Sequence, residues 1–343
     1  MRAMVLEAYD TPLKLMDLPM PKPGPREALV KVSACGAGLT LHHALRGTNP
    51  VKLPAIVGHE IFGEVVELGA AAEGLSVGDK VTLYCIVHCG HCRFCRTGRE
   101  SVCVNSPGMI GNVRHGGYAE YMTAPDKNLM KLPPRLVERY TPAEIGPICD
   151  AMATPFKVAR KARLAPLETC VVYGAAGGVG IHMLDVIRLA GARIIAVDRG
   201  EAKLKALAKL GAHEVVDADK VDVAAEVMRL TGGHGADVVA DYVGSKETLE
   251  NGLACLGKGG RLVIVGLTAN AVPSYAAGLV MRNEIEILGS RGFNRQEVLD
   301  CLELTAQGLL RPVVNHVLPL EQANEATRLV ASEGNVGRVV LTM

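Results

Sequence analysis

Apolar and polar positions follow two different patterns along the chain. Up to about residue 135, short runs rich in β-branched and apolar residues are separated by Gly and Pro, and they fall at residues 28–33, 63–68, 80–85 and 118–122. Short runs of this kind between turn-forming residues are typical of strands. The first part of the chain is therefore predicted to be a small, irregular all-β region.

From about residue 154, strand-like apolar runs alternate with helical stretches. Strands are predicted at residues 171–173, 193–197, 236–242, 260–266 and 284–289, and helices at residues 180–189 and 201–210. This alternation predicts an α/β fold with a doubly wound parallel sheet. The last fifty residues add helices at 295–307 and 321–331 and strands at 313–318 and 338–341. We expect three segments, residues 1–150, 151–290 and 291–343.

A glycine-rich turn lies between the first strand of this sheet and the helix that follows it. Gly174, Gly177, Gly178 and Gly180 leave the backbone bare where its amides can hold a pyrophosphate at the helix N-terminus. A strict G-x-G-x-x-G motif would also need glycine at position 175, which is Ala. The turn predicts a dinucleotide site, and a simple strand-to-helix packing turn is the alternative.

The next predicted strand ends at Asp198. A carboxylate at this place can accept hydrogen bonds from the ribose diol of an adenosine, and it repels a 2′-phosphate. NAD(H) is therefore favoured over NADP(H), although the neighbouring Arg199 weakens that preference.

Charge and composition exclude several other functions. The 37 basic and 36 acidic residues nearly cancel and aromatic residues make up only 3%, so a nucleic-acid surface is not expected. We find no apolar run long enough to span a bilayer and no signal-peptide core near Met1. A cytoplasmic location is expected. Because that compartment is reducing, the ten cysteines are not expected to form disulfides.

Four of these cysteines, Cys89, Cys92, Cys95 and Cys103, lie in one short segment. Tetrahedral Zn²⁺ takes four thiolates, and this spacing supplies a closed set without an open position for substrate. We predict a structural zinc site, with an iron–sulfur cluster or buried cysteines as alternatives. His88 and His91 are expected to be bystanders.

Residues 58–72, which begin Gly58-His59-Glu60, resemble the signature of the zinc-containing medium-chain alcohol dehydrogenases. The cysteine segment, the glycine-rich turn and Asp198 follow in the order found in that family. The resemblance implies a GroES-like catalytic domain, a Rossmann domain before a C-terminal return to the catalytic domain, and hydride transfer between an alcohol and NAD(P). It also implies a homodimer or homotetramer.

The resemblance further implies a catalytic zinc, but the first of its usual ligands is missing. Gly38 stands where the family has a cysteine, and we expect Cys35, on the incoming strand, to point elsewhere. His59, Glu60 and Asp150 are left as candidate ligands. Asp150 is preferred to its neighbour Cys149 because a cofactor-contacting Thr often follows the third ligand by four residues, as Thr154 does here.

Other roles also come from the resemblance. Thr40 and His43 match the family's proton relay, with His42 as an alternative to His43. The residues implied to contact the cofactor, in addition to Asp198 and Arg199, are Thr154, Gly174, Gly177, Gly178, Val179, Lys203, Val265 and Gly266.

Taken together, these features predict an NAD-dependent dehydrogenase of a secondary or cyclic alcohol, in which zinc polarises the alcohol or ketone oxygen. A rival prediction keeps the fold and the cofactor but loses the catalytic zinc, giving a reductase of an activated C=C bond. Gly38 is the residue that motivates it. A non-enzymatic zinc-loop binding module is a third possibility.

Overall fold

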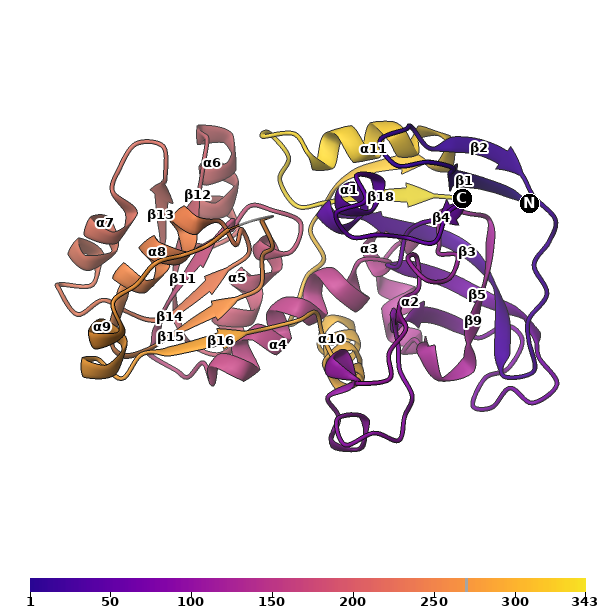
Figure 1. Cartoon of the computed structure of the whole chain (residues 1–343), viewed down its shortest axis with the longest axis horizontal. Helices are drawn as coiled ribbons and strands as arrows, with labels where there is room; N and C mark the ends of the chain where they lie inside the picture. Colours follow the sequence, from indigo (N-terminus) through magenta and orange to yellow (C-terminus); the bar gives the residue numbers. More distant parts are fainter. Residues whose placement is uncertain (269–270) are drawn as a thin grey trace.

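The computed structural model describes residues 1–268 and 271–343. Two lobes lie side by side, and each is built on its own main sheet (Figure 1). Residues from both ends of the chain form the lobe that carries the N- and C-termini, while the middle of the chain forms the other. Among the described residues, no helix combines the length and the apolar character that crossing a membrane requires.

The terminal lobe contains a seven-stranded sheet in the order β10-β6-β5-β3-β18-β17, with β9 also paired with β3. Its strands are β3 (Glu27–Ala37), β5 (Ile61–Leu68), β6 (Lys80–Leu83), β9 (Tyr121–Pro125), β10 (Leu129–Lys131), β17 (Val314–Pro319) and β18 (Arg338–Thr342). A smaller sheet has the order β2-β1-β4, with β1 (Arg2–Leu6), β2 (Lys14–Asp17) and β4 (Ala55–Ile56), and β7 (Ile86–Val87) pairs with β8 (Gly108–Met109). The closing strand β18 thus lies beside β3, from the start of the chain.

The prediction that this first region is all-β is wrong. Helix α1 (Leu39–Leu45) follows β3 directly and buries Leu41 and Ala44, and α2 (Pro134–Arg139) begins where the region ends. A seven-residue helix has too few turns to show a clear apolar period, so the sequence pattern missed it. The strand expected at 118–122 lies three residues later, as β9, and Ala119 makes only an isolated bridge to Ala3.

The other lobe is a six-stranded parallel sheet in the order β13-β12-β11-β14-β15-β16. This order, with the first strand in the middle, is that of the doubly wound dinucleotide-binding fold. Its strands are β11 (Thr169–Tyr173), β12 (Arg193–Asp198), β13 (Glu214–Asp217), β14 (Ala236–Asp241), β15 (Leu256–Ile264) and β16 (Glu286–Gly289). Its helices are α4 (Ala153–Ala162), α5 (Gly180–Leu189), α6 (Glu201–Lys209), α7 (Val223–Leu230), α8 (Lys246–Ala254) and α9 (Ala277–Arg282). The α/β prediction is confirmed.

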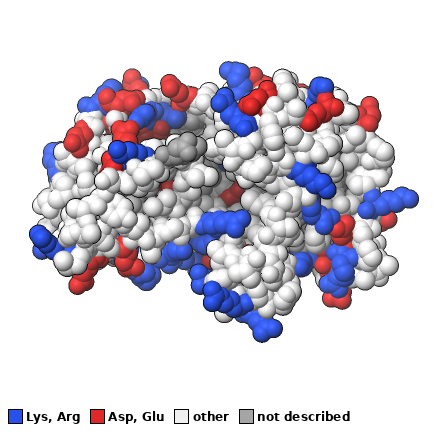
Figure 2. Space-filling view, in the orientation of Figure 1, with Lys and Arg blue, Asp and Glu red and all other residues white. Residues whose placement is uncertain are grey.

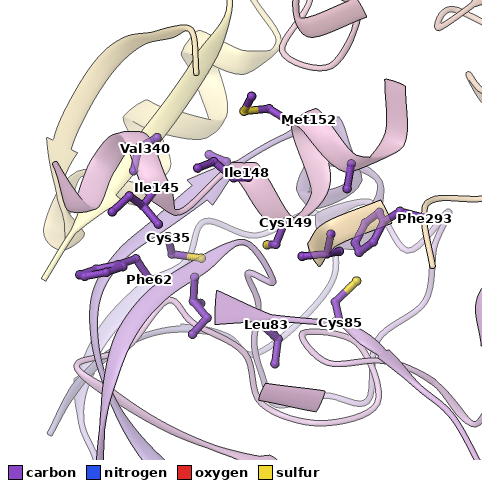
Figure 3. Packing of buried hydrophobic residues seen from close by; sticks show 14 of the residues in the cluster. Cys35, Phe62, Leu83, Cys85, Ile145, Ile148, Cys149, Met152, Phe293 and Val340 are labelled. Carbon is purple, nitrogen blue, oxygen red and sulfur yellow. The ribbon is translucent and has the colours of Figure 1, made fainter. Parts of the chain in front are cut away.

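Three further helices pack on the terminal lobe or between the lobes (Figure 1): α3 (Pro142–Ile145), α10 (Arg295–Ala306) and α11 (Ala323–Val330). A π-helical turn at Ile148–Met152 joins α3 to α4 and packs against α10. Figure 3 shows this turn above the strands of the terminal lobe, with the Cys35, Cys85 and Cys149 side chains among apolar neighbours. The turn therefore carries the chain from one lobe to the other across a continuous core.

Candidate functional site

The cysteine segment brings four sulfur atoms together. The Sγ–Sγ distances are 3.5 Å for Cys92–Cys95, 3.6 Å for Cys89–Cys103 and 3.9 Å for both Cys89–Cys95 and Cys92–Cys103. Four sulfurs placed tetrahedrally at about 2.3 Å from a zinc ion are about 3.8 Å from one another. The spacing thus fits a single ion, whereas an iron–sulfur cluster would hold its sulfur ligands farther apart.

The surroundings of these thiols shift their pKa values in opposite directions. Hydrogen bonds from the backbone near His91 and Cys92, opposed by partial burial, lower the pKa of the Cys89 thiol to about 5. Burial and neighbouring thiols raise the pKa of Cys95 to about 12. The rings of His88 and His91 contact the carbonyl oxygens of Ile86 and Cys89 at 3.3 Å and 3.1 Å and lie outside the sulfur cluster.

The second donor group is assembled from distant segments. His59 and Glu60 immediately precede β5, and Asp150 lies in the π-helical turn. Oxygen and nitrogen donors of the three residues lie within 4.8 Å of one another. His59 Nε2 is 2.9 Å from Asp150 Oδ2, and the Thr154 hydroxyl donates to Asp150 Oδ1 at 2.8 Å. The structure thus groups Asp150 with His59, while the Cys149 thiol points into the core (Figure 3).

The charges of this group are balanced within the protein. Burial alone would lower the pKa of His59, but its hydrogen bond and ion pair with Asp150 raise it. Burial likewise opposes the ionisation of Asp150, yet the hydrogen bond and charge of His59 lower the Asp150 pKa to about 2. The imidazolium and the carboxylate therefore stabilise each other in a site with little access to water.

Glu60 has a partner that the sequence pattern did not indicate. Arg338, the first residue of β18, donates from Nε to Glu60 Oε2 at 2.9 Å and from Nη2 to Oε1, and both side chains are buried. Burial raises the pKa of Glu60 to about 7, although the guanidinium acts in the opposite direction. No motif surrounds Arg338 in the sequence, so only the pairing of β18 with β3 could have suggested it.

The position of the missing cysteine is filled by this same guanidinium. A Cβ atom built on Gly38 would lie 2.4 Å from Arg338 Nη2 and 2.7 Å from Nη1. Among the described residues, the donor group does not include Cys35, which is buried in the core with its Sγ 2.9 Å from the place of a Cβ on Gly58. A metal ion here would thus have His59 and Asp150 as direct ligands, and it would share Glu60 with Arg338.

The donor chemistry nevertheless suits zinc. Imidazole and carboxylate ligands without thiolate occur in catalytic zinc sites that leave one position open. His59, Asp150 and Glu60 could hold such an ion, with Thr154 orienting Asp150 through its hydrogen bond. The difference from the cysteine cluster is that each of these donors already has a partner within the protein.

The glycine-rich turn has the close packing that a phosphate cradle needs. Gly174 has a φ of +69°, and a Cβ on Gly180 would lie 2.2 Å from the carbonyl oxygen of Gly174. A Cβ on Gly178 would lie 2.8 Å from Arg338 Nη1. Gly177 and Val179 complete the turn into α5. The turn therefore lies next to the buried Glu60–Arg338 pair, so the two lobes meet at this point.

Asp198 lies at the carboxyl end of β12 beside this turn. Its Oδ2 accepts from the Ala176 amide at 2.8 Å, and Lys203 Nζ lies 3.2 Å from its Oδ1. Arg199 is turned away and pairs with Asp219 at 3.3 Å. The carboxylate is therefore held at the edge of the sheet where dinucleotides bind, with its neighbouring arginine neutralised.

The remaining predicted residues lie at element ends. Val265 and Gly266 follow β15, and both of their amides donate to the carbonyl oxygen of Asp241. Thr40 and His43 lie three residues apart on α1, and the His43 ring contacts Thr48 Oγ1 at 3.2 Å. Within residues 1–268 and 271–343, no hydrogen bond joins the Thr40 and His43 side chains.

Three features together define a dinucleotide-dependent oxidoreductase with residues suited to bind zinc. They are the doubly wound sheet, the acidic residue at the end of its second strand, and the buried donor group at the lobe boundary. Two family models match the chain. The alcohol dehydrogenase GroES-like domain covers residues 24–134, and the zinc-binding dehydrogenase domain covers residues 178–307.

Relatives that match over the whole chain support the same family assignment. An NAD-dependent alcohol dehydrogenase of Sulfurisphaera tokodaii is 37% identical, over 99% of each chain. An acryloyl-coenzyme A reductase of Metallosphaera sedula is 31% identical over the full length of both. The crystal structure of an NAD-dependent alcohol dehydrogenase superposes with a TM-score of 0.92 at 33% identity, covering all of both chains. The chain belongs to the zinc-containing medium-chain alcohol dehydrogenase family.

Proposed function

We propose that the protein transfers a hydride between NAD and the carbinol carbon of a secondary or cyclic alcohol, and that residues 1–150 with 291–343 form the catalytic domain and residues 151–290 the NAD domain. The placement of the His59–Asp150–Glu60 group against the glycine-rich turn carries this proposal. It joins a site for the reacting oxygen to a site for the cofactor. The relatives that bear the name NAD-dependent alcohol dehydrogenase support the same activity.

We assign the roles of the residues from the family resemblance, and their positions in the structure support these assignments. The pyrophosphate would be held by Gly174, Gly177, Gly178 and Val179. The adenosine ribose would be bound by Asp198 and Lys203. The nicotinamide side of the cofactor would be contacted by Thr154, Val265 and Gly266. Zinc bound by His59, Asp150 and Glu60 would act as a Lewis acid on the substrate oxygen. Thr40 and His43 would carry the hydroxyl proton from the substrate toward solvent.

The rival function, reduction of an activated C=C bond, is supported by two observations. Arg338 fills the place of the missing ligand beside Gly38, and a relative of equal length is an acryloyl-coenzyme A reductase. In such a reaction the nicotinamide delivers hydride to the β-carbon, and a proton is added at the α-carbon. A metal is dispensable there, because the conjugated carbonyl already polarises the double bond.

The two functions are separated by substrate and by metal content. We expect NADH oxidation with secondary or cyclic ketones and about two zinc ions per chain if the first proposal holds. Turnover only of activated enoyl compounds, with one zinc per chain, would replace it by the rival. Absence of saturable NADH binding in a fluorescence titration would contradict both.

Asp198→Ala tests the cofactor site. Removing the carboxylate eliminates its repulsion of a 2′-phosphate, so the ratio of kcat/KM for NADPH to kcat/KM for NADH should rise by about tenfold or more. Glu201→Gln changes an exposed acid in the same region and should leave the ratio unchanged. Unchanged selectivity in Asp198→Ala would contradict the role of this residue.

A homodimer or homotetramer and a cytoplasmic location complete the proposal. Strand β16 ends the six-stranded sheet, and among residues 1–268 and 271–343 no strand pairs with its outer side. Near it, Val272, Tyr275, Leu279 and Met281 are exposed. An open strand edge beside apolar side chains is a surface suited to a second copy. All ten cysteines are free, which suits a reducing compartment.

A further inference from the structure

A pocket lies between the cysteine segment and the parallel sheet, and the proposed function assigns it no role. Its volume is about 310 Å³. Its walls come from the segment before Cys103, from α4, from the ends of β15 and β16, and from the loop that leads to α10. The side chains that matter most for its chemistry are Arg99, Lys157, Lys161, Ser290 and Arg291.

The pocket is positively charged. Arg99, Lys157, Lys161 and Arg291 all line it, and in the part of the chain that the structure describes none of them forms an ion pair with a carboxylate. Burial, together with the charges of the other three, lowers the pKa of Lys157 to about 8. Four cations that share one small pocket and have no direct carboxylate partner repel one another, and an anion would relieve that repulsion.

Glu297, an acidic group that acts on the pocket, is engaged elsewhere. Glu297 raises the pKa of Lys157, which places it within electrostatic reach. Its carboxylate, however, accepts from the Asn294 amide at 2.8 Å and lies 3.8 Å from Arg160. Lys157 itself donates to Ser101 Oγ at 2.8 Å and to the Arg291 carbonyl oxygen at 2.9 Å, so its ammonium is fixed at the pocket wall.

A second, independent feature of the pocket is an unsatisfied hydroxyl. Ser290 is 6% exposed, and its Oγ has no hydrogen-bond partner among the described residues. Leaving a buried hydroxyl without a hydrogen-bond partner is unfavourable. A hydroxyl beside four cations is suited to donate to an oxygen of an anion that they attract.

The pocket opens where substrates reach the sheet. It includes Ile264 and Gly289, the last residues of β15 and β16, and Val265 follows Ile264 directly. Ligands of doubly wound sheets bind outside the carboxyl ends of the strands. Figure 2 shows Lys and Arg side chains gathered below the hollow between the lobes, over the region of α4 and the cysteine segment in Figure 1.

We propose that this pocket binds a phosphate or pyrophosphate group carried on the tail of the substrate. Its volume is at the lower end of the range of about 300–1,000 Å³ found for small-molecule sites, so it can take such a group but not the whole substrate. The reactive part of the same molecule would then extend toward the nicotinamide side of the sheet. This inference rests on the proposed hydride transfer and adds a substrate class to it, namely phosphorylated compounds or nucleotide-linked acyl compounds.

Calorimetry on the NAD⁺-saturated, zinc-loaded enzyme tests the pocket without turnover. Adenosine 3′,5′-bisphosphate is the probe, adenosine is the uncharged control, and saturating NAD⁺ keeps the probe out of the cofactor site. We expect one bound bisphosphate per chain and no binding of adenosine. Lys161→Gln should weaken bisphosphate binding about tenfold, since it removes one charge-assisted contact. Ser290→Ala should weaken it about threefold.

Lys209→Gln is the matched control, because Lys209 is an exposed lysine on α6, outside the pocket. Equal binding to Lys161→Gln and Lys209→Gln would overturn the proposal, as would absence of saturable binding. Tighter binding of inorganic phosphate than of the bisphosphate would indicate a free-ion site and would also overturn it.

Steady-state kinetics then connect the pocket to the substrate. The bisphosphate should raise KM for a phosphate-bearing substrate without lowering kcat, and Lys161→Gln should raise KM for that substrate but not for an analogue without the phosphate tail. A lowered kcat at unchanged KM would show that the bisphosphate binds apart from the substrate, contrary to the proposal. Because binding is read by calorimetry, it is independent of whether an alcohol or a C=C bond reacts.

Discussion

The two donor groups of this protein are built in opposite ways. The four cysteines come from one short segment, and their sulfur atoms have little to bind except one another and a metal. The other group, His59, Glu60 and Asp150, is assembled from distant elements. Its members already have partners, because His59 pairs with Asp150 and Glu60 pairs with Arg338. A metal in the first group therefore completes the local structure, whereas a metal in the second has to compete with protein partners.

The largest effect should come from removing a ligand of the cysteine cluster. Cys92→Ser should lose one zinc ion per chain and destabilise the protein by about 4–5 kcal/mol, because the ion bound by the four thiolates joins the two ends of that segment. Metal analysis and chemical unfolding measure both effects. Cys170→Ser, in a core strand, should lower stability through packing but leave zinc content unchanged. Equal zinc content in the two variants would contradict the structural role of the cluster.

The next effect concerns the pairing that sets the second group apart. Arg338→Met leaves Glu60 buried without its counter-charge and should lower the free energy of unfolding by about 3 kcal/mol. Adding Glu60→Gln should recover part of this loss, because the buried charge is then gone. Arg328→Met breaks an exposed pair with Glu325 and should cost less than about 1 kcal/mol. Similar losses for Arg328→Met and Arg338→Met would remove the distinction drawn between the two donor groups.

The smallest effect is on how tightly the second group holds its metal. Gly38→Cys should tighten zinc binding only slightly, since the new Cβ would lie 2.4 Å from Arg338 Nη2. With Arg338→Gln in addition, the second group should keep its zinc against a chelator about tenfold more tightly, because the thiolate then has room. Leu39→Cys adds a thiol at an exposed neighbouring position and should change nothing. If neither Gly38 variant holds zinc more tightly, the alignment of Gly38 with the missing ligand is wrong.

The two groups also differ in how far the sequence predicts them. The spacing of Cys89, Cys92, Cys95 and Cys103 contains nearly all the information needed, because the ligands are local. The grouping of His59 with Asp150 came from a family resemblance, and the structure places the two side chains at 2.9 Å. Arg338 was not predicted, because its partner Glu60 is 278 residues away and only sheet pairing brings them together.

The distance along the sequence also explains which other features the sequence predicts and which it does not. The parallel sheet and the positions of α5 and Asp198 follow from alternating local patterns, which sequence reasoning reads well. Helix α1 is too short for such a pattern. The basic pocket draws Arg99, Lys157 and Arg291 from three separate segments, so no single stretch of sequence indicates it.

The return of β18 to the first-made sheet has a consequence for how the protein is synthesised. His59, Glu60 and the cysteine cluster leave the ribosome early, but the cation that neutralises Glu60 is made 278 residues after it. A nascent or truncated chain that stops just before residue 338 has the ligands and the whole NAD domain, yet it has an uncompensated buried carboxylate where the lobes meet. The site can therefore mature only after β18 has been synthesised, and a product that stops before β18 would be unable to assemble it.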